Sequence, residues 1–196
     1  MSPLQITAEW QGPIFIGNLP VGGEFKNLKK PGVYIYTQEY PKKLVAYAGQ
    51  NKNVIGRIQQ HYCGFIGFMY WPRDSEGEYI AKEKWKDKQF EYLNKIDEEI
   101  QCRIDGAKRL KFFYCILEQD NGSLVRPVES VLIRVLKDKA DQDERGIRKK
   151  FECDNYRREG YLDNYPRIIL INNFSKGQSI LKNLLGSEPI KGGRNP

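Results

Sequence analysis

Five side chains of this sequence have the types and the spacing needed to act together on a phosphate group. Tyr34 and Tyr47 stand in two short runs of strand-forming residues, and Arg57 and His61 follow in a segment with helical periodicity. Glu129 stands near the beginning of a later helical segment. A guanidinium can bind two phosphate oxygens, an imidazole can accept a proton near neutral pH, and a carboxylate is a hard ligand for Mg²⁺. With two phenols added, these groups suit hydrolysis of a phosphodiester with one divalent metal.

A β-hairpin is expected to carry the two tyrosines. The segments GVYIYT (32–37) and LVAYAGQ (44–50) are rich in β-branched and aromatic residues, and a polar turn separates them. Strands joined this closely pair antiparallel, so the hydroxyls of Tyr34 and Tyr47 are expected to converge on one face. A neighbouring cation is expected to lower the phenol pKa, ordinarily about 10, enough for proton abstraction. Aromatic packing between sheet and helix is the alternative explanation.

A helix over VIGRIQQHYCG (54–64) is expected to present the arginine and the histidine. Asn51 or Asn53 can cap its first turn. Arg57 and His61 are four residues apart and therefore share one face. The apolar positions form another face: Ile55, Ile58 and Tyr62. A solvated arginine and a structural histidine remain the ordinary explanations for these two residues taken singly.

The glutamate is expected at the edge of an apolar stripe. In a helix over PVESVLIRVLKDKA (127–140), Glu129 projects between Leu136 and Ile133. A partly desolvated carboxylate is costly unless a positive group pairs with it, and Mg²⁺ is one such group. A glutamate in the first helical turn, favoured by the helix dipole, is the alternative.

Composition narrows the class of protein. A length of 196 residues predicts one domain, and the net charge of +7 favours a polyanionic partner. No apolar run approaches membrane-spanning length, and the N-terminus lacks a signal-peptide pattern, so a cytoplasmic protein with no membrane partner is expected. The four cysteines are scattered, which favours free thiols over a zinc site or a disulfide framework.

The remaining segments follow from hydrophobic periodicity. Residues 64–81 indicate a loop, 109–119 a central strand, 166–173 another strand and 177–186 a short helix. A helix over 82–104 is expected to turn an apolar stripe inward, formed by Leu93, Ile96, Ile100 and Ile104. No strand is predicted before residue 30.

The order of these motifs resembles the GIY-YIG nuclease superfamily. The resemblance rests on GVY (32–34), YAG (47–49), the Arg and His of GQNKNVIGRIQQHY (49–62), and ES-x-LI (129–133). It implies an α/β (α+β) fold, with a small three-stranded antiparallel sheet flanked by helices. The expected single domain has a core at about 30–64 and 109–138. The expected additions are insertions at 64–108 and 139–167 and a C-terminal extension over 168–196.

The resemblance also implies roles for the five residues in a metal-dependent DNA endonuclease. Tyr34 would be the general base or the water-orienting phenol, and Tyr47 would position the scissile phosphate. Arg57 would stabilise transition-state charge, and His61 would hydrogen-bond a tyrosine or relay a proton. Glu129 would hold Mg²⁺, for which Mn²⁺ can substitute.

The sequence departs from the family pattern in two ways. Ala48 replaces the usual isoleucine of the second motif, and no asparagine follows the Glu129 helix closely. Asn172 or Asn173 could fill that asparagine position, with Asn155 as a weaker choice. Residues expected to contact double-stranded DNA lie after the second motif, in the basic insertion and in the later strand: Gln50, Lys149, Lys150, Arg157, Arg158 and Asn173.

These expectations favour a sequence-specific, restriction-like endonuclease. A structure-specific repair nuclease or a mobile-element nuclease is one alternative, and a catalytically inactive DNA-binding module of the same fold is another. Cutting both strands needs either a homodimer on DNA or two sequential visits, and the sequence does not choose between them.

Overall fold

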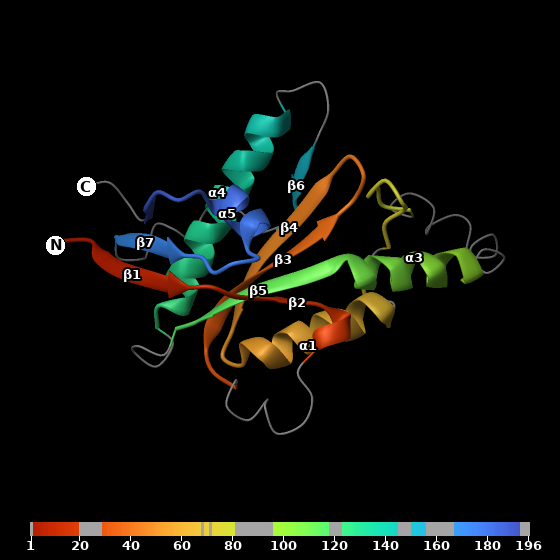
Figure 1. Cartoon of the computed structure of the whole chain (residues 1–196), viewed down its shortest axis with the longest axis horizontal. Coiled ribbons are helices and arrows are strands. Elements are labelled where there is room, and N and C mark those ends of the chain that lie inside the picture. The colour runs from red at the N-terminus through yellow and green to blue at the C-terminus, as the bar shows by residue number, and fades with distance from the viewer. Residues whose placement is uncertain are drawn as a thin grey trace.

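The structure is a computed structural model that describes residues 2–19, 29–67, 69–70, 72–80, 96–117, 123–144, 150–155 and 167–192. These residues form two sheets and four α-helices (Figure 1). The strands are β1 Leu4–Glu9, β2 Gln11–Ile14, β3 Gly32–Glu39, β4 Leu44–Asn51, β5 Leu110–Ile116, β6 Phe151–Cys153, β7 Ile168–Asn173 and β8 Ile190–Gly192. The helices are α1 Val54–Ile66, α3 Ile96–Arg109, α4 Val125–Glu144 and α5 Ser179–Leu185, with a 3₁₀ turn at Ile16–Asn18.

The larger sheet has the strand order β2-β5-β3-β4-β6. Its middle strands β5, β3 and β4 are antiparallel, as predicted for residues 109–119 and for the hairpin. The sheet is nevertheless wider than the predicted three strands. Strand β2 pairs antiparallel with β5, and β6 pairs parallel with β4. The sequence did not reveal either edge strand, because β2 is short and interrupted by Pro13 and β6 is only three residues long within a charged segment.

The two faces of this sheet are covered by different helices (Figure 1). Side chains alternate along β3, so Val33 and Ile35 lie in one apolar cluster and Tyr34 and Tyr36 in another. The first cluster contains residues of α4, and the second contains residues of α1. The tyrosine face is therefore the α1 face, and the opposite side is the α4 face.

A second sheet, of order β1-β7-β8, packs on the far side of α4. Strand β1 lies parallel to β7, from Leu4 opposite Ile168 to Glu9 opposite Asn173. The strand at 168–173 was predicted, whereas β1 was not. Its apolar residues Ile6 and Ala8 join the same buried cluster as Leu170 and Val131.

The predicted orientation of α3 was wrong. Ile96, Ile100 and Ile104 are 37–40% exposed, whereas Glu99 and Arg103 face inward at 4% and 5% exposure. A charged pair can face inward here because its two charges lie against each other: Arg103 donates to Glu99 Oε1 and to the backbone carbonyls of Phe65 and Tyr70. Leu93 and the rest of the predicted helix before Ile96 lie outside the described residues.

Helix α4 begins at Val125, two residues before the predicted start at Pro127. A proline is tolerated there because the first helical turn has no intrahelical acceptor for its N–H. Within the described part of the chain, no helix is long and apolar enough to cross a membrane.

Candidate active site

The hairpin and α1 bring four of the five predicted residues together on the α1 face. The Tyr34 hydroxyl lies 2.7 Å from His61 Nε2. The ring centroids of Tyr34 and Tyr47 are 6.2 Å apart, and those of Tyr47 and His61 are 5.7 Å apart. The prediction that both phenols share a face with the histidine is confirmed.

Gly49 makes room for this arrangement. It stands opposite Tyr34 in the β3–β4 register, and a Cβ atom at Gly49 would lie 2.4 Å from the Tyr34 hydroxyl oxygen. That separation is far below van der Waals contact, so any larger residue would displace the phenol. The glycine of the YAG motif therefore has a steric role at the site.

Helix α1 is positioned by its cap. The Asn53 side chain accepts a hydrogen bond from Gly56 N at 3.0 Å. Asn53 is one of the two residues that were predicted to cap this helix. The next turn presents Arg57, which donates to Gln60 Oε1 at 3.1 Å and lies within hydrogen-bonding reach of the Tyr34 hydroxyl. His61 follows one turn later and is buried. The guanidinium thus lies at the solvent boundary, above the Tyr34–His61 pair.

Protonation at this pair differs from the prediction. Burial raises the pKa of Tyr34 well above its ordinary value, Tyr47 adds to the rise, and the opposing effect of Arg57 is too small to reverse it. Burial, with the nearby Arg57 charge, lowers the pKa of His61 to about 3. Tyr34 is therefore a neutral phenol, not a phenolate, and His61 is a neutral imidazole at physiological pH. Of the two, only the imidazole has an unprotonated nitrogen, and its low pKa makes it a weak base.

The lowered pKa of His61 predicts an acid-sensitive fold. The unfolded chain takes up a proton at the ordinary value of 6.5, whereas the folded chain does so only near 3. The stabilisation is complete above pH 6.5 and is lost as the pH falls, by at most about 1.4 kcal/mol per pH unit. Urea unfolding between pH 8 and pH 4 should give a steeper decline for the wild type than for His61→Gln. Parallel declines would contradict the assignment.

Glu129 lies in a different layer from these four residues. It is 5% exposed, and its helix packs on the α4 face, where Val128 and Val131 join Val33 and Ala48 in one cluster. The later part of α4 reaches β6 beside Leu44, so the turn that carries Glu129 lies toward the opposite end of the sheet.

That opposite end is called the Gly32 end, because β3 begins there. Strand β4 ends at the same place, and α1 begins there, with Val54 N donating to Lys30 O. Leu117 N donates to Pro31 O, which brings the chain after β5 to this end as well. Arg57 and Glu129 therefore approach the same end of the sheet from its two faces.

The magnesium site expected at Glu129 stays a prediction. No group of three or more His, Cys, Asp or Glu side chains in the described ranges is placed to hold a metal. Mg²⁺ often takes only one or two carboxylates and completes its shell with water and phosphate oxygens. Glu129 is the residue that would hold such an ion, and a carboxylate is also a suitable ligand for Mn²⁺.

Asn155 is in contact with the second motif. Its Oδ1 accepts from Ala48 N at 2.9 Å and its Nδ2 donates to Ala48 O at 2.7 Å, so it binds the middle residue of the second motif. Asn172 and Asn173 lie in the second sheet, where they bond Trp10 and Glu9. Of these three asparagines, only Asn155 contacts a residue of the second motif, and which of them fills the family position stays a prediction.

Removing the Asn155 side chain should destabilise the edge of β4. Asn155→Ala leaves a buried N–H and a buried C=O of Ala48 without partners, a cost of about 2 kcal/mol. Urea unfolding measures this loss. Asn173→Ala, at an exposed position, is the control and should change the unfolding free energy by less than about 0.5 kcal/mol. Equal effects of the two substitutions would contradict the assignment.

The residues predicted to contact DNA are only partly gathered at the Gly32 end. Gln50 is there, opposite Val33 in the register, and strand alternation places it on the α4 face. Lys150 lies at the other end, which we call the hairpin end, because its carbonyl accepts from Leu44 N. Asn173 is in the second sheet. Lys149, Arg157 and Arg158 lie outside the described residues.

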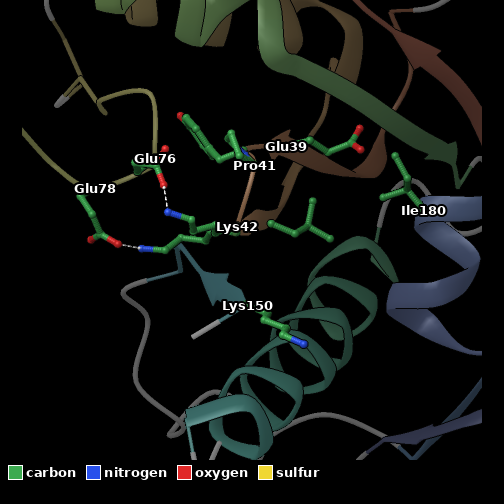
Figure 2. A pocket seen from close by; sticks show the side chains of 10 residues that line it. Glu39, Pro41, Lys42, Glu76, Glu78, Lys150 and Ile180 are labelled. Carbon is green, nitrogen blue, oxygen red and sulfur yellow. Dashed lines mark hydrogen bonds and ion pairs between the residues drawn. The ribbon is translucent and has the colours of Figure 1, made fainter. Parts of the chain in front are cut away.

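A pocket of about 920 Å³ at the hairpin end is lined by Lys150 and by paired charges (Figure 2). Lys42 Nζ lies 2.9 Å from Glu76, and Lys43 pairs with Glu78. Glu39, Glu76 and Glu78 line the pocket, so the pocket is a poor site for a polyanion. Lys150 therefore stands apart from the residues around Tyr34.

Sequence reasoning missed several residues that support the tyrosines. Tyr36 stacks on Tyr47 with centroids 5.0 Å apart, and its hydroxyl donates to Asp154 at 3.1 Å. Arg73 in turn donates to Asp154 at 3.1 Å. Burial and the Asp154 charge raise the pKa of Tyr36, so its hydroxyl stays a donor. The aromatic residues of the 64–81 loop were the one sign in the sequence that this loop packs against the site. The partner of Arg73, Asp154, is too distant in sequence to be inferred from it.

No protein-family model, no curated protein and no solved structure matches this chain.

Proposed function

We propose that this chain is a metal-dependent DNA endonuclease of the GIY-YIG superfamily, with a restriction-like, sequence-specific activity. The observation that carries the proposal is the buried 2.7 Å contact between the Tyr34 hydroxyl and His61 Nε2, with Arg57 beside it. A neutral imidazole can accept a hydrogen bond from the phenol and orient its oxygen toward an attacking water, and a guanidinium at the same point can hold the phosphate that the water attacks.

The protonation states define how the residues would act. An attacking water donates its hydrogen bond to the Tyr34 oxygen, and the Tyr34 proton moves to His61 Nε2 as the bond to phosphorus forms. Arg57 donates to the phosphate oxygens, where negative charge increases in the transition state. Tyr47 orients the same phosphate. Glu129 would hold Mg²⁺, and the ion would supply positive charge near the phosphate and the leaving 3′-oxygen. The product strand keeps a 5′-phosphate.

The distribution of charge supports DNA at the Gly32 end. Four basic side chains flank this end and are exposed: Lys29, Lys30, Lys52 and Arg126. At the hairpin end, Lys42, Lys43 and Lys111 each pair with a glutamate. Exposed lysines and arginines provide the sequence-independent attraction to a phosphate backbone. These side chains would guide the backbone to the end of the sheet that Arg57 and Glu129 approach from its two faces.

Incubation of the purified chain with plasmid DNA and Mg²⁺ tests the proposal. Discrete linear fragments are expected, and EDTA should stop their formation. Nicking confined to branched DNA would instead indicate a structure-specific nuclease. Salt-sensitive binding without cleavage under Mg²⁺ or Mn²⁺ would overturn the enzymatic proposal and indicate a binding module.

A further inference from the structure

The second ring nitrogen of His61 has its own partner, Tyr70. The Tyr70 hydroxyl lies 3.1 Å from His61 Nδ1, and the two rings stack with centroids 5.6 Å apart and an interplanar angle of 18°. Gly64 creates the space, since a Cβ atom there would lie 2.4 Å from the Tyr70 ring. His61 is therefore held between two phenols, one on each nitrogen.

The inward-facing charges of α3 hold Tyr70 in place. Arg103 Nη1 donates to the Tyr70 carbonyl at 2.7 Å, and Arg103 Nε donates to Glu99 Oε1 at 2.8 Å. Both charged side chains are 4% exposed. The remaining donors of Arg103 bind backbone carbonyls, so this buried pair fixes the backbone at Tyr70. This explains why α3 turns Glu99 and Arg103 inward while its isoleucines stay exposed.

The surroundings of His61 favour one tautomer. Arg57 can only donate, and its positive charge beside the Tyr34 oxygen favours a hydroxyl hydrogen that points away from it, toward His61 Nε2 at 2.7 Å. A neutral imidazole that accepts at Nε2 carries its hydrogen on Nδ1. Nδ1–H then donates to the Tyr70 oxygen. The chain of contacts runs in one direction, from Arg57 through Tyr34 and His61 to Tyr70.

We propose that Tyr70 is a positioning residue that fixes His61 as the Nδ1-protonated tautomer, with the Glu99–Arg103 pair as its anchor. The catalytic meaning of this arrangement rests on the proposed nuclease function. One proton passes from water through the Tyr34 hydroxyl to Nε2 while the water oxygen bonds to phosphorus. The P–O3′ bond breaks, and the leaving oxygen takes a proton from solvent. The resulting imidazolium keeps its Nδ1–H bond to Tyr70.

Nitrogen NMR of the free protein tests the tautomer without any need for nuclease activity. The chain has a single histidine, so ¹⁵N-histidine labelling reports on His61 alone. The wild type should show a protonated Nδ1 and an unprotonated Nε2. Tyr70→Phe keeps the stacked ring and should shift the population toward Nε2–H. A wild-type spectrum dominated by Nε2–H, or an unchanged tautomer in Tyr70→Phe, would overturn the proposal.

Tyr62→Phe is the matched control. Tyr62 adjoins His61 on α1, and its hydroxyl donates to Leu110 O at 3.0 Å and Ile14 O at 3.3 Å, away from the imidazole. This variant should keep the wild-type tautomer even if it lowers stability. A shift in Tyr62→Phe equal to that in Tyr70→Phe would assign the effect to general loosening and overturn the specific role of Tyr70.

The kinetic result separates the two proposals. Tyr70→Phe should lower kcat for DNA cleavage by about 10- to 100-fold at unchanged KM, because correct orientation of a general base is worth this much or more. A tautomer shift in a chain that never cleaves DNA would refute the nuclease function and leave the positioning role intact. If Tyr70→Phe changes the tautomer of His61 but cleaves DNA at the wild-type rate, the catalytic part of the inference is overturned.

Discussion

Replacing Glu129 with alanine is expected to abolish DNA cleavage while DNA binding survives. The carboxylate is the residue assigned to Mg²⁺, and loss of the charge stabilisation that a metal gives a transition state lowers kcat by about 1,000-fold or more. Binding should change only severalfold, because it depends mainly on basic residues at the Gly32 end. Single-turnover cleavage and fluorescence anisotropy with labelled duplex measure the two effects.

Two further variants make this result interpretable. Glu129 is 5% exposed, so alanine leaves a cavity, whereas Glu129→Gln keeps the volume and removes only the charge. Glu129→Gln should be as inactive as Glu129→Ala. Asp138→Asn removes a carboxylate from an exposed position of the same helix and should cut like the wild type. A Glu129→Ala protein that cuts at the wild-type rate would remove this residue from the mechanism.

Tyr34→Phe is expected to lower the cleavage rate by about 100- to 10,000-fold, the range for loss of a proton-transferring group. The substitution removes one oxygen, so the packing of the ring against Gly49 and Phe112 stays intact. The attacking water then loses its route to His61. Single-turnover rates under saturating protein isolate this chemical step from binding.

Tyr114 provides the matched control for Tyr34. It pairs with Tyr34 across β3 and β5 and lies in the same buried cluster. Tyr114→Phe deletes an equivalent hydroxyl from the same face of the sheet and should leave the cleavage rate within a factor of about two, as expected for a tolerated substitution. Comparable losses in Tyr34→Phe and Tyr114→Phe would show that the effect is structural.

The sequence by itself determined the local framework of the candidate site. Alternation within 32–37 and 44–50 placed Tyr34 and Tyr47 on one face, since successive strand residues point to opposite sides. The four-residue spacing of Arg57 and His61 placed them on one helical face in the same way. Both rules act over a few residues, so no distant contact was needed to apply them.

Tertiary structure decided how α3 is rotated and what completes the sheet. The apolar repeat Ile96, Ile100 and Ile104 predicted a buried stripe, but the Glu99–Arg103 pair is buried instead. Periodicity counts apolar residues and cannot show that carbonyls of a distant loop will satisfy an arginine. Asn155 similarly reaches Ala48 across 107 positions, a distance in sequence over which no local rule operates.

The protonation of the site also depended on the fold. A sequence gives each phenol and imidazole its ordinary pKa, and the presence of Arg57 suggested a lowered phenol pKa. Burial proved the larger effect: it raises the pKa of Tyr34 and lowers that of His61, because a low-dielectric surrounding disfavours the charged form of either group. The sequence thus determined which groups meet, and packing decided which of them can accept a proton.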